Sequence, residues 1–244
     1  MRETSLNDQK TLVTALADDV RRAESASRTL NLRLKAYREH SHRLRPEFTK
    51  AYDRLVARLG MLDRGEIGPQ LGERMPSFLL PDENGRLVSL DSLLRSGPVV
   101  VSFNRGHWCP YCKLELRSLA GIYPEIERLG AQIVSIMPDR VEFTQRSAEL
   151  DALPFPVLSD IDLGYSLSLG LIYWVGAEIR RLYEDAGVEL ELYHGNQTYF
   201  LPMAAKFIVG PDGLVKSRQV NIEFRQRMEP EEIVAVLRKL REPQ

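Results

Sequence analysis

The sequence contains very little cysteine: only Cys109 and Cys112 occur among its 244 residues. A chain of this size therefore does not depend on a network of disulfides, and with 43% hydrophobic residues it can bury a core of its own. The two thiols stand three residues apart in the stretch RGHWCPYCKL. The question is what a protein so poor in cysteine does with one close pair.

The sequence also lacks long apolar runs and an excess of charge of either sign. No stretch approaches the roughly 20 apolar residues of a transmembrane helix, and the first residues, MRETSLNDQK, lack the apolar segment of a secretory signal. Its 33 basic and 34 acidic residues argue against a surface for nucleic acid. We therefore expect a cytoplasmic protein without membrane or nucleic-acid partners, where a close cysteine pair is catalytic or metal-binding.

Residues 1–70 are predicted to form a helical extension, because no strand-like run precedes Phe78. Pro46 is typical of the first turn of a helix, and helix ends are expected near Gly60 and Gly65. The apolar stripes of this extension indicate helix-on-helix packing, with a dimerisation or docking surface as the alternative; a homodimer through these helices is the corresponding assembly. Apolar residues recur at helical spacing in two stripes: Leu30, Leu34 and Tyr37, then Phe48, Tyr52, Leu55, Leu59 and Leu62.

Residues 71–244 alternate between strand and helix patterns. Apolar runs such as GPVVVSFN, AQIVSIMP and FPVLSD predict strands, and hairpins are expected at Asn84-Gly85 and at residues 210–213. A helix after the cysteines should kink or break at Pro124, and a last helix should begin near Pro230. An insertion is expected at about 161–200, with a helix near 176–186. The order predicts an α/β fold with a mixed central sheet flanked by helices.

The cysteine pair falls where a buried strand ends and a helix begins. The free N–H groups and the dipole of such a helix stabilise a thiolate at its first turn. Cys109 is expected at the cap, with Pro110 at the first helical position and Cys112 one turn later on the same face. We expect Cys109 to face outward as the attacking thiolate, and Cys112 to lie deeper as the thiol that resolves a mixed disulfide.

A metal site and an accident of packing account for the pair less well. Half of a zinc site needs further ligands, and beyond the nearby His107 the chain has no second cysteine pair and only scattered histidines. An accident of packing would not explain the strand-to-helix setting or the adjacent Trp108. We predict a redox couple that needs neither a metal nor a bound cofactor, because both electrons reside on sulfur.

The stretch WCPYC after VVVSF resembles the redox motif of thioredoxin-fold proteins, and Cys-Pro-Tyr-Cys also resembles the glutaredoxin motif. The wider sequence is similar to the alkyl hydroperoxide reductase/thiol-specific antioxidant (AhpC/TSA) family, in its peroxiredoxin-like branch. The matching segments between Gly72 and Val220 are GERMPSFLLPDENGRLVSLDSLL, FNRGHWCPYCKLEL, IVSIMPD, FPVLSD and KFIVGPDGLV.

This resemblance implies a thioredoxin-like fold and an antioxidant enzyme that reduces hydrogen peroxide or organic hydroperoxides through a Cys109–Cys112 dithiol/disulfide cycle. An external thiol donor, such as a thioredoxin or glutaredoxin system, would restore the dithiol. The alternatives are a thiol–disulfide oxidoreductase that acts on protein disulfides, and a redox-sensing interaction module.

The family pattern of a hydroxyl residue, two residues, the peroxidatic cysteine, two residues and often a Glu fits in two registers. With Cys109 as the peroxidatic residue, Gly106 takes the hydroxyl position; with Cys112, Cys109 takes it and Glu115 takes the acidic one. Thioredoxin-type disulfide exchange favours Cys109, whereas for attack on peroxide both cysteines stay open. Ala204 takes the position of the cis-proline of thioredoxin-like proteins, and whether Pro202 supplies a cis bond is open.

Residues around the pair carry further predictions. Arg105 is expected to lower a thiolate pKa or hold a peroxide oxygen, or else to be a solvated charge at the strand end. Trp108 is expected to be a packing lid rather than a substrate contact. Glu115 is expected to be a helix-face carboxylate paired with Lys113 or Arg117, with a catalytic role as the alternative.

Three weaker candidates complete the set. His107 is expected to be an exposed loop residue, with proton donation to a leaving thiolate as the alternative. Tyr111, between the cysteines, is expected to tune the redox potential through its exposure. Asp160 and Asp162 are interpreted as a capping or turn feature rather than a metal site.

Overall fold

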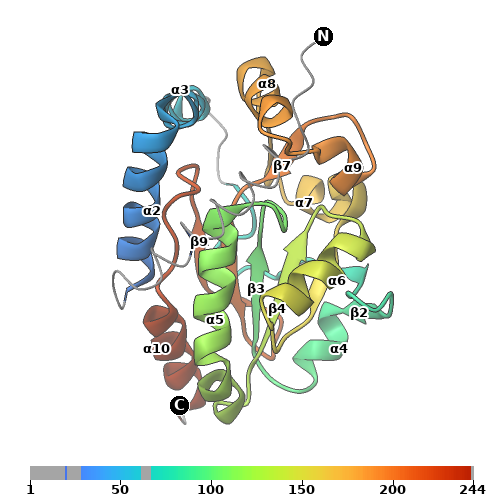
Figure 1. Cartoon of the computed structure of the whole chain (residues 1–244). Coiled ribbons are helices and arrows are strands. Elements are labelled where there is room, and N and C mark those ends of the chain that lie inside the picture. Colours follow the sequence, from blue (N-terminus) through green and yellow to red (C-terminus); the bar gives the residue numbers. More distant parts are fainter. Residues whose placement is uncertain (1–19, 21–28, 62–66, 243–244) are drawn as a thin grey trace.

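The computed structural model describes Val20 and residues 29–61 and 67–242. A five-stranded sheet forms its centre, in the order β5-β4-β3-β8-β9 (Figure 1). The first three of these strands are parallel, and β8 and β9 run antiparallel to their neighbours. The mixed α/β sheet predicted from the sequence is confirmed. The strands are β3 (Val99–Phe103), β4 (Gln132–Met137), β5 (Val157–Ser159), β8 (Ala205–Val209) and β9 (Val215–Val220).

Helices cover both faces of the sheet because the central strands are apolar on both sides. Val100 of β3 packs into one hydrophobic core with α5 (Pro110–Arg128) and α10 (Pro230–Arg241), whereas Val99 and Val101 face the opposite core. That second core includes α3 (Pro46–Gly60) and most of the segment between β5 and β8. The remaining helices of the central part are α4 (Leu90–Leu94) and α6 (Val141–Leu150).

The segment predicted as an insertion folds onto the second core. Its longest helix, α8, matches the helix predicted near 176–186, and its two strands form a small sheet of their own. Its elements are the 3₁₀ turn η1 (Ile161–Leu163), α7 (Gly164–Ser168), β6 (Ile172–Trp174), α8 (Ala177–Asp185), α9 (Leu190–His194) and β7 (Phe200–Pro202).

Both predicted hairpins are present, but of the kink or break predicted at Pro124 the break is wrong. Asn84 and Gly85 connect β1 (Leu79–Pro81) to β2 (Leu87–Ser89), and residues 210–213 connect β8 to β9. The helix α5 continues through Pro124 because residues on both sides of it, such as Leu119 and Ile126, are buried in the same core. Tertiary packing here outweighs the hydrogen bond that proline removes.

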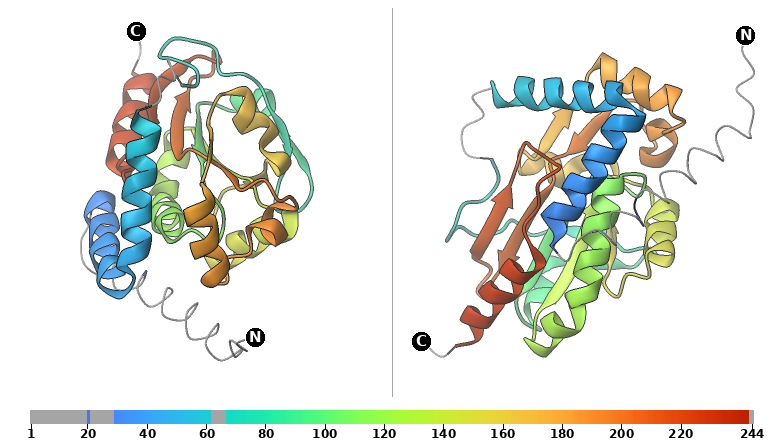
Figure 2. Two further views of the ribbon diagram at one scale, coloured as in Figure 1. Left: turned by 90° about the horizontal axis from the view of Figure 1, so that it is seen from above. Right: turned by 60° about the vertical axis from the view of Figure 1, so that its left-hand side comes forward.

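Two N-terminal helices, α2 (Leu30–Leu44) and α3 (Pro46–Gly60), pack against the rest of the chain. Figure 2 shows α2 beside α5 and α3 near α8. The helix ends at Gly60 as predicted, whereas Leu62 and Gly65 lie outside the described residues. Both apolar stripes are directed inward, which supports helix packing as their role: Leu30, Leu34, Tyr37, Leu55 and Leu59 are buried.

The first turn of α2 is held by residues almost 200 positions away. The Leu30 and Asn31 backbone N–H groups donate to the Glu229 carboxylate at 2.8 and 2.9 Å. The Asn31 side chain donates to the Arg227 carbonyl at 2.7 Å and accepts from the Arg227 N–H at 3.0 Å. A carboxylate at this end of a helix satisfies free donors and opposes the helix dipole.

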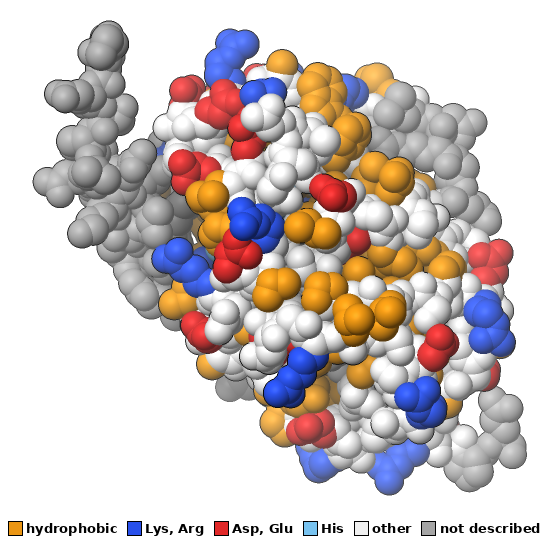
Figure 3. All heavy atoms as spheres, turned by 90° about the vertical axis from the view of Figure 1, so that its right-hand side faces the viewer, with side chains coloured by type: hydrophobic (Ala, Val, Ile, Leu, Met, Phe, Trp, Pro, Cys, Tyr) orange, Lys and Arg blue, Asp and Glu red, His pale blue; other side chains and the backbone are white. Residues whose placement is uncertain are grey.

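Large apolar side chains also remain exposed, among them Leu79, Leu87 and Leu167. Figure 3 shows several apolar side chains on the face that forms the right-hand side of Figure 1. Exposed apolar surface is therefore not limited to the N-terminal helices. No helix in the described ranges is long and apolar enough to cross a membrane.

We predict that Glu229→Ala lowers the free energy of unfolding by about 1 kcal/mol, because two helix N–H groups lose their acceptor. Urea unfolding measures this change, and hydrogen exchange should show faster exchange within residues 30–44. The exposed Glu231, two residues along the chain, provides the matched control as Glu231→Ala. An equal loss in both variants, or unchanged exchange in α2, would contradict the role of Glu229 as a cap.

Candidate active site

The two cysteines lie at the predicted junction between strand and helix. The strand β3 ends at Phe103, Cys109 is the N-cap of α5, and Pro110 is the first helical residue. The Cys112 thiol donates to the Cys109 sulfur over a distance of 3.0 Å. The Arg105 N–H in turn donates to the Cys112 sulfur at 3.4 Å. The turn therefore places the two sulfur atoms in direct contact.

Both thiols are completely buried, so the prediction that Cys109 faces outward is wrong. The reason is the N-terminal extension, which places Leu30 and Tyr37 in the same apolar cluster as the cysteines. Phe224, from the segment that follows β9, closes the cluster from another side. The sequence pattern at the cysteines cannot reveal this cover, since it comes from distant segments.

Arg105 is also buried, which excludes its interpretation as a solvated charge at the strand end. Its Nη1 lies 3.8 Å from the Cys109 sulfur, and its Nη2 donates to the Tyr183 hydroxyl at 2.6 Å. Its guanidinium lies 3.9 Å from the centre of the Phe224 ring, with Trp108 and Tyr52 at 5.2 and 5.6 Å. Among the described residues no carboxylate pairs with this cation, and its Nε has no partner.

These surroundings separate the pKa values of the two thiols. Burial raises the pKa of Cys109, but the hydrogen bond from Cys112 and the charges of Arg105 and Arg227 lower it overall, to about 6. Burial, together with the hydrogen bond and the negative charge of Cys109, raises the pKa of Cys112 well above its ordinary value. At neutral pH the pair therefore holds a thiolate on Cys109 and a proton on Cys112.

Glu115 is not a helix-face carboxylate; it is buried beneath the cysteines. Its carboxylate binds Lys206 Nζ at 2.8 Å and Arg227 Nε at 3.0 Å. Burial raises the pKa of Glu115, yet these two cations lower it overall. The predicted pairing with a neighbour on the helix is wrong, because Arg117 instead binds Asp151 at 2.9 Å.

Arg227 connects this ion cluster to the second thiol. Its Nη2 lies 3.7 Å from the Cys112 sulfur, while its Nε holds Glu115. Each thiol thus has an arginine beside it: Arg105 beside Cys109 and Arg227 beside Cys112. Arg227 lies outside the segments that the sequence singles out, and only its place in the short, charged stretch EFRQR marks it.

Trp108 and Tyr111 both pack around the pair. The Trp108 ring contacts Tyr183 edge to face, with 5.1 Å between centroids, and remains partly exposed. Gly106 has a positive φ of 139°, and a Cβ there would lie 2.4 Å from the Trp108 Nε1, so this close approach requires glycine. Tyr111 is buried, so its predicted action through exposure is wrong.

His107 belongs to a buried network, so its prediction as an exposed loop residue is wrong. Its side chain is only 12% exposed, and its Nδ1 lies 3.2 Å from the buried carboxylate of Asp139. His194 of α9 reaches the same carboxylate, with its Nε2 at 3.4 Å. The His107 backbone N–H also donates to Asp139, at 2.6 Å. This network joins the cysteine turn to the segment predicted as an insertion.

The remaining sequence candidates have structural roles. Asp160 caps α7 by accepting from the Tyr165 and Ser166 N–H groups at 2.9 and 2.8 Å, as predicted for a cap. The peptide bond of Pro202 is trans, because no cis bond occurs in the described part of the chain. Ala204 packs in the apolar cluster of the cysteines. The described residues contain no group of three side chains suited to a metal ion.

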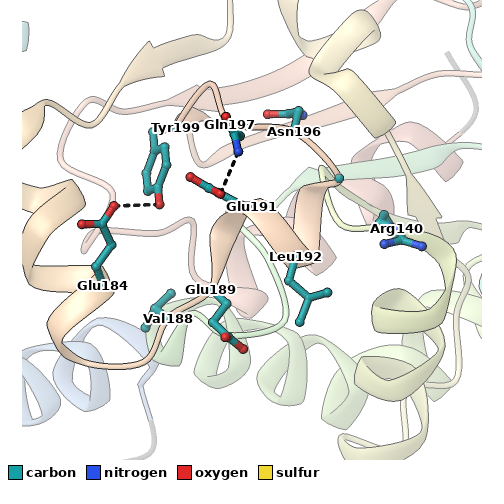
Figure 4. A pocket seen from close by; sticks show the side chains of 10 residues that line it. Arg140, Glu184, Val188, Glu189, Glu191, Leu192, Asn196, Gln197 and Tyr199 are labelled. Atoms are coloured by element: carbon teal, nitrogen blue, oxygen red, sulfur yellow. Dashed lines mark hydrogen bonds between the residues drawn. The ribbon is translucent and has the colours of Figure 1, made fainter. Parts of the chain in front are cut away.

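A pocket of about 70 Å³ reaches Arg105, whose guanidinium contacts the Cys109 sulfur, although neither cysteine belongs to its lining. Its lining residues come from α2 and α3, from the cysteine turn and from α8 with the turn after it, and they include Arg105 and Trp108. A larger hollow of about 740 Å³, drawn in Figure 4, is lined by none of the residues of the cysteine turn. Two of its three acids are engaged locally, since Glu184 accepts from Tyr199 and Glu191 from Gln197. The smaller pocket is therefore the candidate site.

Comparison with known proteins gives the same picture of the fold. The model of the AhpC/TSA family matches residues 71–218. Peroxiredoxin Q from Populus jackii is 31% identical over 133 residues, which cover 53% of this chain and 54% of that protein. Peroxiredoxin Bcp of Escherichia coli is 32% identical over 91 residues, 37% of this chain and 58% of that one. The matches thus span about half the length of these curated relatives.

Among solved structures, the peroxidoxin BcpB of Mycobacterium tuberculosis superposes with a TM-score of 0.55 at 22% identity. The superposition covers 70% of this chain and 97% of that one. Similarity at this level concerns the fold, and it confirms the predicted thioredoxin-like architecture.

We predict that absorbance of thiolate at 240 nm rises with a midpoint near pH 6, and that Cys109→Ser removes this step. Arg105→Met should raise the midpoint because the thiolate loses a neighbouring cation, whereas Arg105→Lys should keep it closer to that of the parent. The pKa of Cys109 is lower in the folded state than in the unfolded state, so the ionised thiolate stabilises the fold. This stabilisation is lost as the pH falls from about 9 to about 6. A midpoint near 9 in the parent protein would contradict the assignment.

Proposed function

The chain belongs to the AhpC/TSA family, and from this membership we propose that it is a thiol peroxidase that reduces hydrogen peroxide or organic hydroperoxides. The observation that carries the proposal is the ionised Cys109, with a pKa of about 6, in contact with a buried arginine and a protonated second thiol. Only a thiolate attacks peroxide at a useful rate, and this site favours one at neutral pH.

In the first step the Cys109 thiolate attacks the terminal oxygen of the hydroperoxide. The S–O bond forms as the O–O bond breaks, which yields a sulfenic acid on Cys109 and an alkoxide. The Arg105 guanidinium, next to the sulfur, stabilises the negative charge as it moves from sulfur to oxygen. We therefore assign attack on peroxide to Cys109 and the electrostatic role to Arg105.

The alkoxide needs a proton, and Cys112 holds one beside the reacting sulfur. Transfer of this proton releases the alcohol and leaves a thiolate on Cys112. Once Cys109 is a neutral sulfenic acid, its charge no longer raises the pKa of Cys112, while Arg227 still lies 3.7 Å from that sulfur. Arg105 thus stabilises the thiolate on Cys109, and Arg227 then stabilises the thiolate on Cys112.

In the second step the Cys112 thiolate attacks the Cys109 sulfur. An S–S bond forms and hydroxide leaves, which becomes water with a proton from solvent. The two sulfur atoms start 3.0 Å apart, so little movement is needed. Glu115 acts as a positioning residue, because its ion pair with Arg227 holds that arginine beside Cys112.

An external dithiol must then reduce the disulfide, and we propose a donor of the thioredoxin or glutaredoxin type. Such a cycle requires a compartment that keeps thiols reduced, which is why we retain a cytoplasmic location in the proposal. The domain boundaries and the assembly stay predictions. They are an extension at residues 1–70, a thioredoxin-like domain at residues 71–244 with an insertion at about 161–200, and a homodimer through α2 and α3.

The AhpC/TSA membership favours the peroxidase over the alternative, a reductase of protein disulfides. A redox-sensing role for the N-terminal helices stays a prediction. Insulin reduction, measured beside hydroperoxide consumption, tests the reductase against the peroxidase.

We predict that the protein with a thiol donor consumes cumene hydroperoxide or hydrogen peroxide faster than dithiothreitol alone, and that Cys109→Ser abolishes this activity. After peroxide treatment of Cys112→Ser, mass spectrometry with a sulfenic acid probe should label Cys109. A sulfenic acid on Cys112 in Cys109→Ser, with none in the converse variant, would reverse the assigned order. No consumption above the dithiothreitol rate would refute the peroxidase itself.

We predict that Arg227→Met slows formation of the disulfide by about tenfold or more, the effect of one pKa unit on the Cys112 thiolate. Stopped-flow tryptophan fluorescence after one equivalent of peroxide separates sulfenic acid formation from disulfide formation. Arg227→Lys keeps the positive charge and should restore part of the rate. Equal slowing of both steps in Arg227→Met would indicate general disruption rather than a role in resolution.

A further inference from the structure

The candidate pocket is built from three parts of the chain that lie far apart in sequence. Arg105 belongs to its lining, and beside this cation lies the reactive sulfur. The N-terminal helices supply one side of the pocket and α8 supplies another. The aromatic residues of the lining are Tyr37, Phe48, Tyr52, Trp108, Tyr111 and Tyr183.

This lining is more apolar than hydrogen peroxide requires. A volume of about 70 Å³ holds several water molecules, since one needs roughly 10–15 Å³ of such space. The room therefore exceeds a hydroperoxy group. Contact between these aromatic walls and an organic group is more favourable than contact between the walls and water. The pocket thus fits a hydroperoxide that carries a compact apolar group.

A second cation, Arg45, also lines the pocket. It lies at the joint between α2 and α3, is half-buried, and places its guanidinium 5.8 Å from the centre of the Phe48 ring. Within the described ranges no carboxylate forms an ion pair with it. Arg38 of α2, by contrast, binds Asp53 at 3.0 Å.

An arginine of this kind is suited to bind an anion from outside the chain. Its planar guanidinium pairs with a carboxylate through two parallel hydrogen bonds, and the nearby aromatic ring limits competition by water. Arg105 does not serve this purpose in our scheme, because its charge is balanced by the Cys109 thiolate. Arg45 is therefore the group that remains for the substrate.

We propose that this pocket selects organic hydroperoxides whose compact apolar body carries a carboxylate at the end remote from the O–O bond. The carboxylate binds Arg45, the body contacts the aromatic walls, and the O–O bond lies at Arg105, the lining residue that contacts the Cys109 sulfur. This inference rests on the proposed peroxidase function and adds the substrate class. It concerns binding, so the steps on sulfur are unchanged.

The test compares cumene hydroperoxide with its para-carboxylated analogue, which has the same O–O bond and ring and adds one charge. In the parent protein kcat/KM should favour the acid by about tenfold, at the lower end of what a charge-assisted hydrogen bond provides. Arg45→Gln should bring this ratio close to one, and Arg45→Lys should retain part of it. Arg43→Gln, at an exposed residue outside the pocket lining, should keep the ratio of the parent.

A ratio near one in the parent, or an unchanged ratio in Arg45→Gln, overturns the inference while the peroxidase function stands. If neither hydroperoxide is consumed, the proposed function fails and a binding experiment decides the inference. Calorimetry with 4-isopropylbenzoate, which has the acid and the ring but no O–O bond, then measures the site directly. A Kd about tenfold weaker in Arg45→Gln supports the carboxylate site, and equal Kd values refute it.

Discussion

The contact between a buried guanidinium and a buried sulfur is the interaction on which the rest of the site depends. Arg105 lies in an aromatic cage without a carboxylate, so its charge has no counter-ion among the described residues other than a thiolate on Cys109. Isolating a cation from water is costly unless an anion lies close to it. The fold therefore stabilises the ionised form of Cys109, because the negative charge of the thiolate balances the positive charge of Arg105.

The charge of the whole cluster points in the same direction. Arg105, Arg227 and Lys206 bring three positive charges, and Glu115 brings one negative charge. With a thiolate on Cys109 the cluster still has one positive charge more than negative. Such an excess favours anionic species, whether a thiolate or an alkoxide, at every stage of the scheme.

The sequence is sufficient to predict the fold and the contact between Cys109 and Cys112. Strand periodicity, the hairpin signals and the spacing of Cys109 and Cys112 are local properties, and local geometry realises them. The environment of the pair was predicted less well, because it is made by contacts across long sequence distances. Nothing near Glu115 indicates that Lys206 and Arg227 will enclose it.

The burial of Cys109 illustrates this limit. At the junction of a strand and a helix the first cysteine usually faces solvent, and the prediction followed that pattern. Here Leu30 and Tyr37 of α2 cover the junction, and Glu229 holds the first turn of that helix in place. The apolar stripe of α2 predicts that this helix packs against other elements, but it does not identify those elements.

The hydrogen bonds between Asn31, Arg227 and Glu229 join an early and a late segment of the chain, so they form only after the late segment has been synthesised. The cysteines leave the ribosome before the segment at 227–229, so the nascent pair lacks Arg227 and the residues that hold the first turn of α2. Until that segment arrives, the hydrogen bond from Cys112 and the charge of Arg105 can lower the pKa of Cys109, but the charge of Arg227 cannot. The contribution of Arg227 to the acidity of the thiol is therefore added last.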